Sequence, residues 1–365
     1  MLHKVNPPGC QDDLKRLLDF QMNVVRFALR ATPGFDEVAL KTGLGNACGT
    51  WLWERMYEHR DLAKPTEFEK AYRALVDHAS SNPVDVPTVL QVMDHDLTFP
   101  TAWGQDGFKF KWPTLTDAWQ KKMARVLEVF YAWLGSGTLD ATLMGCSTSE
   151  LTRLSLMTSY RKVNKPVCPY CDGPAGDWTE TKDANDADHW LPKKRYPLFA
   201  VHWANLFRVC AECNRYFKLD KDPLAPRGSN ELETSYHPFY CPAPAGLVVV
   251  SEELTTGEWS VKLVDSTHPQ RAKNLNNMLD LEKRLIGRIN ASVSESRISV
   301  LYSALAEYED RPFMTKADAA EFLQRQAEVH RRQIGKRPNA ILDATYLELQ
   351  AQSDLAQQAV IDWHL

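Results

Sequence analysis

The chain has 365 residues, of which 44% are hydrophobic and 25% are charged. This length and composition indicate a folded protein with a sizeable core, built as two domains or as one domain with large appendages, and they argue against extended disorder. The formal net charge of -4 argues against a protein that coats nucleic acid over its whole surface, but it permits an enzyme that binds nucleic acid through a local basic patch.

The first residues, Met1 to Pro8, contain no apolar run and no cleavage-site pattern. No stretch of the chain reaches the roughly 20 apolar residues that a helix needs to cross a bilayer. We therefore expect a cytoplasmic chain without a secretion signal and without contact to a membrane.

Residues 11–150 have the spacing of amphipathic helices. A first helix, which ends before Pro33-Gly34, has an apolar face formed by Leu14, Leu17, Leu18, Val25 and Ala28. The clearest pattern is the apolar ladder Trp119, Met123, Val126, Leu127, Phe130 and Leu134. Ladders of this kind are core faces of helices packed in a globular protein. A start of the capping-box type at Ser147–Glu150 predicts one more helix before the cysteine-rich segment.

The C-terminal part returns to regular patterns. Two β-rich runs, Leu247–Val250 and Trp259–Val264, flank Thr256-Gly257 and predict a hairpin. One amphipathic helix is expected to run from Leu275 through Leu279, Glu282, Ile286 and Ile289 to Val293. Further helical stretches are expected over 315–333 and 340–362.

Between these flanks, residues 165–245 lose the periodicity and are rich in proline, glycine, cysteine, aspartate and aromatic residues. We therefore expect an α+β protein that is mostly helical. It has a helical N-terminal region over 1–160, a central core over 161–245 where the chemistry is expected, and a β-hairpin with helices over 246–365.

Four of the eight cysteines form two Cys-x-x-Cys pairs, Cys168 with Cys171 and Cys210 with Cys213. This spacing lets both thiolates of a pair point at one ion, and two pairs complete a tetrahedral zinc site. A redox role for such a pair would need a βαβ context, which the sequence does not display. The sequence therefore favours a structural zinc ion that holds the irregular segment together.

Several short motifs lie between and after the cysteine pairs: Asp188-His189, Pro192-Lys193, Asn205-Leu206, Asn214 directly after the last cysteine, and Lys218. In this order they resemble the HNH nuclease family over about residues 165–222. The resemblance implies a ββα-metal fold, in which a β-hairpin is followed by a helix with the second cysteine pair at its mouth. It therefore implies a zinc-stapled nuclease core in the middle of the chain.

Hydrolysis of a phosphodiester needs an activated water, a cation that absorbs charge on the phosphate, and groups that hold the scissile bond. His189 suits the first task, because an unperturbed histidine is a base near neutral pH. Asp188 and the amide carbonyl of Asn214 are hard oxygen donors that suit Mg²⁺ or Mn²⁺. The resemblance assigns His189 as catalytic base, Asp188 and Asn214 as ligands of the catalytic metal, and Asn205 as the residue that orients His189 through backbone hydrogen bonds. His202 fits the pattern less well and is expected to be structural.

Each of these residues also has a simpler interpretation. A lone histidine such as His189 in an irregular segment is often a surface or capping residue, and Asn214 could cap a helix without any metal. Asp188 could be a surface charge, with Asp183 or Asp186 as rival ligands. The joint placement of the motifs favours the catalytic interpretation.

Basic residues gather around the expected site in a chain that is otherwise net acidic. Those expected to contact the phosphate backbone are Lys193, Lys194, Arg195, Arg215 and Lys218. In many HNH motifs a lysine lies three residues after the final asparagine or histidine. Here Phe217 occupies that position and Lys218 follows it, so the role of Lys218 stays open while the motif itself does not.

A narrower resemblance rests on shorter pieces: Lys4-Val5-Asn6-Pro7-Pro8, Pro192–Pro197, Asp222-Pro223-Leu224 and His237-Pro238. They are similar to HNH proteins of bacterial anti-phage systems, including the nuclease subunit of Septu-type systems, which works with an ATPase partner. This resemblance implies an ATPase partner protein, and the long helical flanks could instead form a homo-oligomer.

The expected function is therefore metal-dependent hydrolysis of DNA by an HNH endonuclease, in anti-phage defence. Two alternatives stay open. The first is a nuclease subunit that is inactive alone and licensed by an ATPase partner. The second is a non-catalytic zinc module that binds nucleic acid or protein, which would hold zinc stoichiometrically without metal-dependent cleavage.

Overall fold

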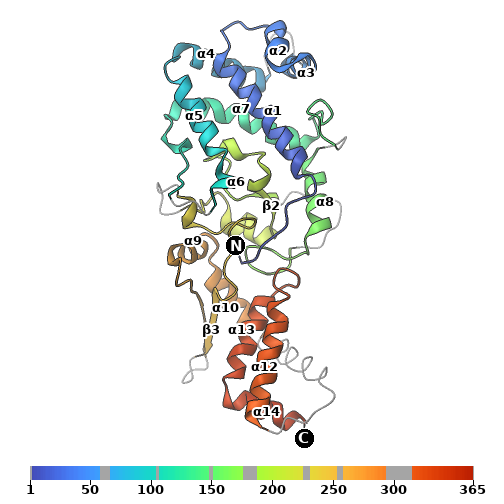
Figure 1. Ribbon diagram of the computed structural model, residues 1–365, viewed down its shortest axis with the longest axis vertical. Helices are drawn as coiled ribbons and strands as arrows, with labels where there is room; N and C mark the ends of the chain where they lie inside the picture. Colours follow the sequence, from blue (N-terminus) through green and yellow to red (C-terminus); the bar gives the residue numbers. More distant parts are fainter. Residues whose placement is uncertain are drawn as a thin grey trace.

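The structure, a computed structural model, describes residues 2–57, 66–103, 107–147, 151–175, 187–224, 231–252, 258–292 and 315–364. Within these residues the protein is mostly helical and has two small antiparallel sheets of two strands each, which confirms the expected α+β class. N-terminal helices form one end of an elongated molecule, and the C-terminal helices α12 (Lys316–Arg331), α13 (Ala340–Ala351) and α14 (Asp354–His364) form the other (Figure 1). In the described part of the chain no helix is long and apolar enough to cross a membrane.

The N-terminal end is built from α1 (Gln11–Arg30), α2 (Glu37–Leu44), α3 (Asn46–Tyr57), α4 (Glu67–Ser81), α5 (Val86–Asp96), α6 (Phe99–Ala102), the short 3-10 helix η1 (Trp112–Thr114) and α7 (Asp117–Ser136). The apolar ladder predicted for α7 is buried along its whole length. Two buried side chains tie the helices together: the Gln21 amide donates to the carbonyl of Leu127 at 2.9 Å, and the Tyr72 hydroxyl donates to the carbonyl of Val24 at 3.0 Å. These bonds fix how α1, α4 and α7 sit on one another, because a buried donor without an acceptor is costly.

The central part contains α8 (Arg153–Val163), β1 (Ala187–His189), η3 (Pro197–Phe199), η4 (Trp203–Asn205), β2 (Leu206–Arg208), the π-helix η5 (Cys213–Lys218) and η6 (Leu232–Thr234). Strands β1 and β2 pair antiparallel, with Asp188 opposite Phe207. The chain between them folds into short 3-10 turns rather than a tight turn, so β1 and β2 enclose a buried loop.

Two hydrophobic cores run through the described residues. The larger one joins the N-terminal helices, the central part and the helices α9 (Pro269–Leu279) and α10 (Leu281–Ser292). A smaller one belongs to α12, α13 and α14. The region boundaries expected at 160 and 245 stay predictions.

The predicted C-terminal hairpin is confirmed. Strand β3 (Val248–Glu252) pairs antiparallel with β4 (Trp259–Leu263), with Val250 opposite Val261. The predicted turn at Thr256-Gly257 lies outside the described residues.

The prediction of a single helix from Leu275 to Val293 is wrong, because the helix is interrupted at Asp280. This residue has a left-handed conformation with φ of 51°, and its N–H donates to the carbonyl of Asn276 at 2.7 Å. The Asn276 side chain accepts the N–H of Glu282 at 3.0 Å and so begins α10. Aspartate is one of the few residues that adopts this conformation readily, which the apolar spacing could not reveal. Val293 itself lies outside the described residues.

The first residues run along the central part rather than along the N-terminal helices. The N–H of Leu2 donates to the carbonyl of Pro169 at 2.7 Å, and that of Val5 donates to the carbonyl of Pro238 at 3.0 Å. The start of the chain therefore lies near the middle of the molecule (Figure 1).

His202 generates a prediction about acid stability. Its ring is buried beside Phe99 and Phe199, its Nδ1 accepts the N–H of Ala204 at 3.0 Å, and burial lowers its pKa to about 3. In the unfolded chain His202 becomes protonated near pH 6.5, whereas in the folded chain it stays neutral down to about pH 3. Between these values each unit of acidification should therefore remove about 1.4 kcal/mol of folding stability at this one position.

The His202→Asn variant tests this, because its amide oxygen can still accept the Ala204 N–H but does not titrate. Urea unfolding from pH 7 to pH 4 should give a shallower loss of stability for the variant than for the wild type. Parallel pH profiles for the two proteins would contradict the prediction. Lys194→Met, at an exposed position that carries no histidine, serves as the control and should give a profile parallel to that of the wild type.

Candidate functional site

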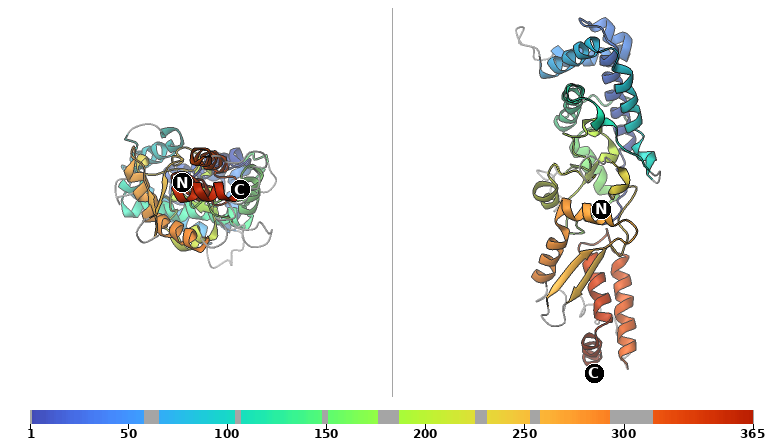
Figure 2. Two further views of the ribbon diagram at one scale, coloured as in Figure 1. Left: turned by 90° about the horizontal axis from the view of Figure 1, so that it is seen from below. Right: turned by 90° about the vertical axis from the view of Figure 1, so that its left-hand side faces the viewer.

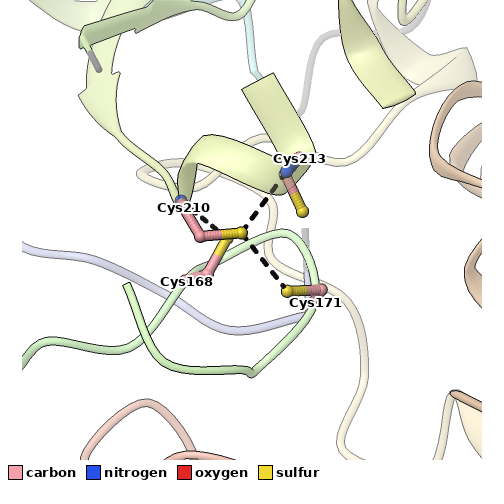
Figure 3. A group of neighbouring side chains, drawn as sticks. All are labelled: Cys168, Cys171, Cys210 and Cys213. Atoms are coloured by element: carbon pink, nitrogen blue, oxygen red, sulfur yellow. Dashed lines mark hydrogen bonds between the residues drawn. The ribbon is translucent and has the colours of Figure 1, made fainter. Parts of the chain in front are cut away.

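The four cysteines of the two pairs form one buried group, the cysteine cluster (Cys168, Cys171, Cys210 and Cys213). Their sulfur atoms all lie within 4.8 Å of one another. Cys168 and Cys171 come from the loop after α8, and Cys210 and Cys213 come from the turn between β2 and η5 (Figure 3). Among the described residues it is the one group of three or more His, Cys, Asp or Glu side chains with such spacing.

The dimensions of the cysteine cluster suit a metal ion. The sulfur atoms of Cys171 and Cys210 are 3.8 Å apart. A tetrahedron with Zn–S bonds of about 2.3 Å has edges of about 3.8 Å. Backbone N–H groups point at the sulfurs, from Cys210 to Cys168 and from Cys213 to Cys210, each at 3.4 Å. Such bonds stabilise thiolates, so the cluster could hold a metal ion such as zinc.

Two arginines of α10 complete the charge balance of the cysteine cluster. The Arg284 guanidinium donates to the sulfur of Cys213 at 3.3 and 3.4 Å, and that of Arg288 donates to the sulfur of Cys171 at 3.2 Å. Hydrogen bonds from neighbouring thiols, followed by the charge of Arg288, hold the pKa of Cys171 well below its usual value. A zinc ion with four thiolates carries two negative charges, which these two cations offset. Sequence reasoning missed both arginines, because nothing in their local pattern points to cysteines about 70 and 117 positions earlier.

Asp188 in β1 is buried between two partners. One carboxylate oxygen accepts the Tyr170 hydroxyl at 2.7 Å, and the other accepts the Lys218 ammonium at 3.2 Å. Burial raises the pKa of Asp188, while the charge of Lys218 and the hydroxyl of Tyr170 act against this rise. Tyr170 lies inside the first Cys-x-x-Cys pair, so the cysteine cluster positions one side of the carboxylate.

His189, the next residue, has different surroundings. Its Nε2 lies 2.9 Å from the carbonyl oxygen of Ala200, and its ring packs edge-on against Tyr131 of α7 at 4.6 Å between centroids. Burial, together with the positive charges of Lys193, Lys218 and Arg153, lowers the pKa of His189 to about 3. The ring is therefore neutral over the physiological range.

Asn205 makes the backbone bonds expected of it. Its side-chain oxygen accepts the N–H of Leu191 at 2.6 Å, and its amide donates to the carbonyls of Leu191 and Phe199 at 3.1 and 3.0 Å. These bonds close the loop between β1 and β2 on itself. The carbonyl of Ala200, which faces His189, follows directly after Phe199, so Asn205 holds the loop that orients the histidine.

Asn214 and Lys218 lie on the π-helix η5, where the N–H of Leu219 donates to the carbonyl of Asn214 at 3.1 Å. Asn214 is half-buried, whereas Lys218 is only 1% exposed. The Lys218 ammonium donates to the carbonyl of His189 at 2.5 Å as well as to Asp188. Lys218 is therefore part of the buried site and not of a basic surface.

The other predicted basic residues are placed differently from one another. Lys193 is half-buried, with its ammonium over the Tyr131 ring at 4.4 Å. Arg195 pairs with Asp222 at 2.8 Å, while Lys194 and Arg215 are exposed. The rival ligands Asp183 and Asp186 lie outside the described residues.

Comparisons with known proteins yield no relative. No protein-family description, no curated protein and no solved structure matches the chain.

The cysteine cluster leads to a prediction about metal content. Purified protein should hold one zinc ion per chain, as measured by elemental (inductively coupled plasma) mass spectrometry. Cys210→Ser should lose this ion, because three thiolates do not complete the tetrahedron. The variant should also melt several degrees lower. Cys48→Ser is the matched control: Cys48 is half-buried and donates to the carbonyl of Leu143 at 3.5 Å, a bond that serine can keep. Full zinc content in Cys210→Ser would refute the assignment.

A second prediction concerns the buried ion pair of Lys218 and Asp188. Lys218→Met leaves a buried carboxylate without its cation, which should cost about 3–5 kcal/mol of unfolding free energy. The double variant Lys218→Met/Asp188→Asn should recover part of that loss, because no charge stays unpaired. Lys194→Met, at an exposed position, should change stability by less than about 0.5 kcal/mol. Equal stability of Lys218→Met and wild type in urea would show that the pair is not formed in solution.

Proposed function

We propose that the chain is a metal-dependent endonuclease of the HNH class and that β1, β2 and η5 form its ββα-metal core. The antiparallel pairing of β1 with β2 supports this proposal, as does a helical turn that follows with the second cysteine pair at its start. This is the order of elements that the HNH resemblance implies.

The observation that carries the proposal is the contact between His189 Nε2 and the carbonyl of Ala200 at 2.9 Å. A carbonyl oxygen only accepts hydrogen bonds, so Nε2 carries the proton of the neutral ring. Nδ1 is then the nitrogen of the ring that can accept a proton. Burial and three nearby cations hold the pKa of this ring at about 3, so the proposed base needs a bound phosphate anion or an opened site, both of which raise the pKa.

Asp188, which precedes His189, and Asn214 offer oxygen atoms of the kind that a metal ion in phosphodiester hydrolysis needs. Asp188 and Asn214 would hold Mg²⁺ or Mn²⁺, which both prefer oxygen ligands. A carboxylate offers about four acceptor positions, and Tyr170 and Lys218 use one on each oxygen of Asp188. When bound, the ion acts as a Lewis acid on the phosphate. Asn205 holds the loop that keeps His189 in place.

The substrate that we propose is DNA, cleaved in anti-phage defence. The low exposure of Asp188 and His189, 4% and 8%, also supports a second proposal, in which the nuclease is silent alone and an ATPase partner opens its site. A non-catalytic zinc module is the remaining alternative, and it predicts zinc without cleavage under any condition.

A plasmid assay tests the main proposal. We expect the purified chain to nick or linearise supercoiled plasmid with Mg²⁺ or Mn²⁺ and to be inactive with a chelator. His189→Gln should reduce the rate by about 10²-fold or more, because its amide can still donate to Ala200 but offers no basic nitrogen. His268→Gln, at a half-exposed histidine, should cleave like the wild type.

Circular dichroism melts of both variants show whether the fold is kept. A folded His189→Gln protein that cleaves at the wild-type rate would contradict the assignment of His189 as the base. Cleavage that arises only when an ATPase partner is added would favour the licensed nuclease over the autonomous one.

A further inference from the structure

A cleft of about 760 Å³ lies beside the proposed site, on the side of the N-terminal helices. We call it the cationic cleft. Its basic residues come from four parts of the chain: Lys70 on α4, Arg125 on α7, Arg153 at the start of α8, and Lys193 in the loop after β1. Of these four, only Lys193 belongs to the basic cluster seen in the sequence.

The cationic cleft has a surplus of positive charge. Its acidic residues are Glu67 and Glu128, and Glu67 pairs with Lys70 at 2.6 Å. In the described part of the chain, no carboxylate oxygen lies within the 4.0 Å of an ion pair from Arg125, Arg153 or Lys193. Glu67 acts on Arg125 and Glu128 acts on Lys193 without a close ion pair. Four cations against two carboxylates leave the cleft positive, and a bound anion would lower the repulsion among the cations.

Arg153 is held in the cationic cleft by packing. Its guanidinium lies over the Tyr131 ring at 5.4 Å and fills the space above Gly135, where an added Cβ would meet it at 2.5 Å. Its Nε is buried and has no hydrogen-bond partner. Arg153 also interacts with Tyr131 by a side-chain hydrogen bond, so its guanidinium is held at the wall of the cleft, where a guanidinium can donate to an anion.

Tyr131 connects the cationic cleft with His189. The Lys193 ammonium lies over its ring, 4.4 Å from the centroid. The His189 ring packs edge-on against the same ring, with 4.6 Å between the centroids. The charges of Lys193 and Arg153 also act on His189, where they oppose protonation. An anion bound in the cationic cleft therefore lies next to the proposed base.

We propose that the cationic cleft binds the sugar–phosphate backbone of the nucleic acid substrate, with Arg125, Arg153 and Lys193 contacting phosphates next to the bond at His189. This inference rests on the proposed function and adds that the N-terminal helices form half of the substrate site. The size of the cleft and its origin in four separate segments suit a polymer of repeated phosphates. Contacts of this kind give affinity without sequence preference and depend strongly on salt.

The test measures binding separately from cleavage. Full-length protein is titrated into a fluorescently labelled DNA duplex with a chelator present, and anisotropy is followed at several salt concentrations. Arg125→Glu should weaken binding by about 10-fold or more. Arg125→Ala should lower the slope of log K against log salt by about 0.9, the value for one lost phosphate contact.

Lys121→Glu is the matched control, because Lys121 is exposed on the same helix α7 one turn earlier and does not line the cationic cleft. It should change the affinity by less than about twofold. Arg125 is itself exposed, so neither substitution disturbs the core.

The outcomes separate this inference from the proposed function. Equal binding by Arg125→Glu, Lys121→Glu and wild type overturns the cleft assignment, even if plasmid cleavage depends on His189. Loss of binding in Arg125→Glu alone supports it, even if the wild type cleaves nothing. Absence of any DNA binding by the wild type at low salt also overturns it.

Discussion

The close approach of four thiol groups in the cysteine cluster is the constraint on which the central part depends. The cluster joins segments that are about 40 residues apart in the chain, and three further parts of the molecule attach to it. Leu2 bonds to the first cysteine pair, Arg284 and Arg288 of α10 donate to its sulfurs, and Asp172, next to Cys171, accepts the N–H of Ile341 at the start of α13. Loss of the cluster would therefore release both ends of the chain as well as the irregular middle.

The same cluster also sets the geometry at Asp188. Tyr170, between the first two cysteines, holds one carboxylate oxygen, and η5, which begins at Cys213, brings Lys218 to the other. A buried carboxylate is tolerated only with partners of this kind. The cysteine cluster is thus linked to Asp188 through the Tyr170 hydroxyl, 18 positions earlier in the chain, and through Lys218 of η5.

Sequence patterns predicted what local spacing determines. The ladder of α7, the C-terminal hairpin and the approach of the two cysteine pairs are confirmed, because each follows from a short period or a fixed spacing. The break at Asp280 was missed, since it depends on one left-handed residue within a continuous apolar pattern. Arg153 and Arg284 were missed for another reason: their roles arise from packing between distant helices, which no single segment encodes. The roles of Asp188, His189 and Asn214 in catalysis stay predictions.

The π-helical geometry of η5 determines the direction in which Lys218 points. Lys218 lies four positions after Asn214, one more than the spacing in many HNH motifs. In an α-helix, one extra position turns a side chain about the helix axis by about 100°. The π-helix η5 contains one extra residue per turn, and the bond from Leu219 to Asn214 marks it. As a result Lys218 points inward to Asp188, while Phe217 packs against the Arg284 guanidinium at 3.9 Å. Phe217 thus contacts an arginine that donates to Cys213, and Lys218 reaches the carboxylate of Asp188.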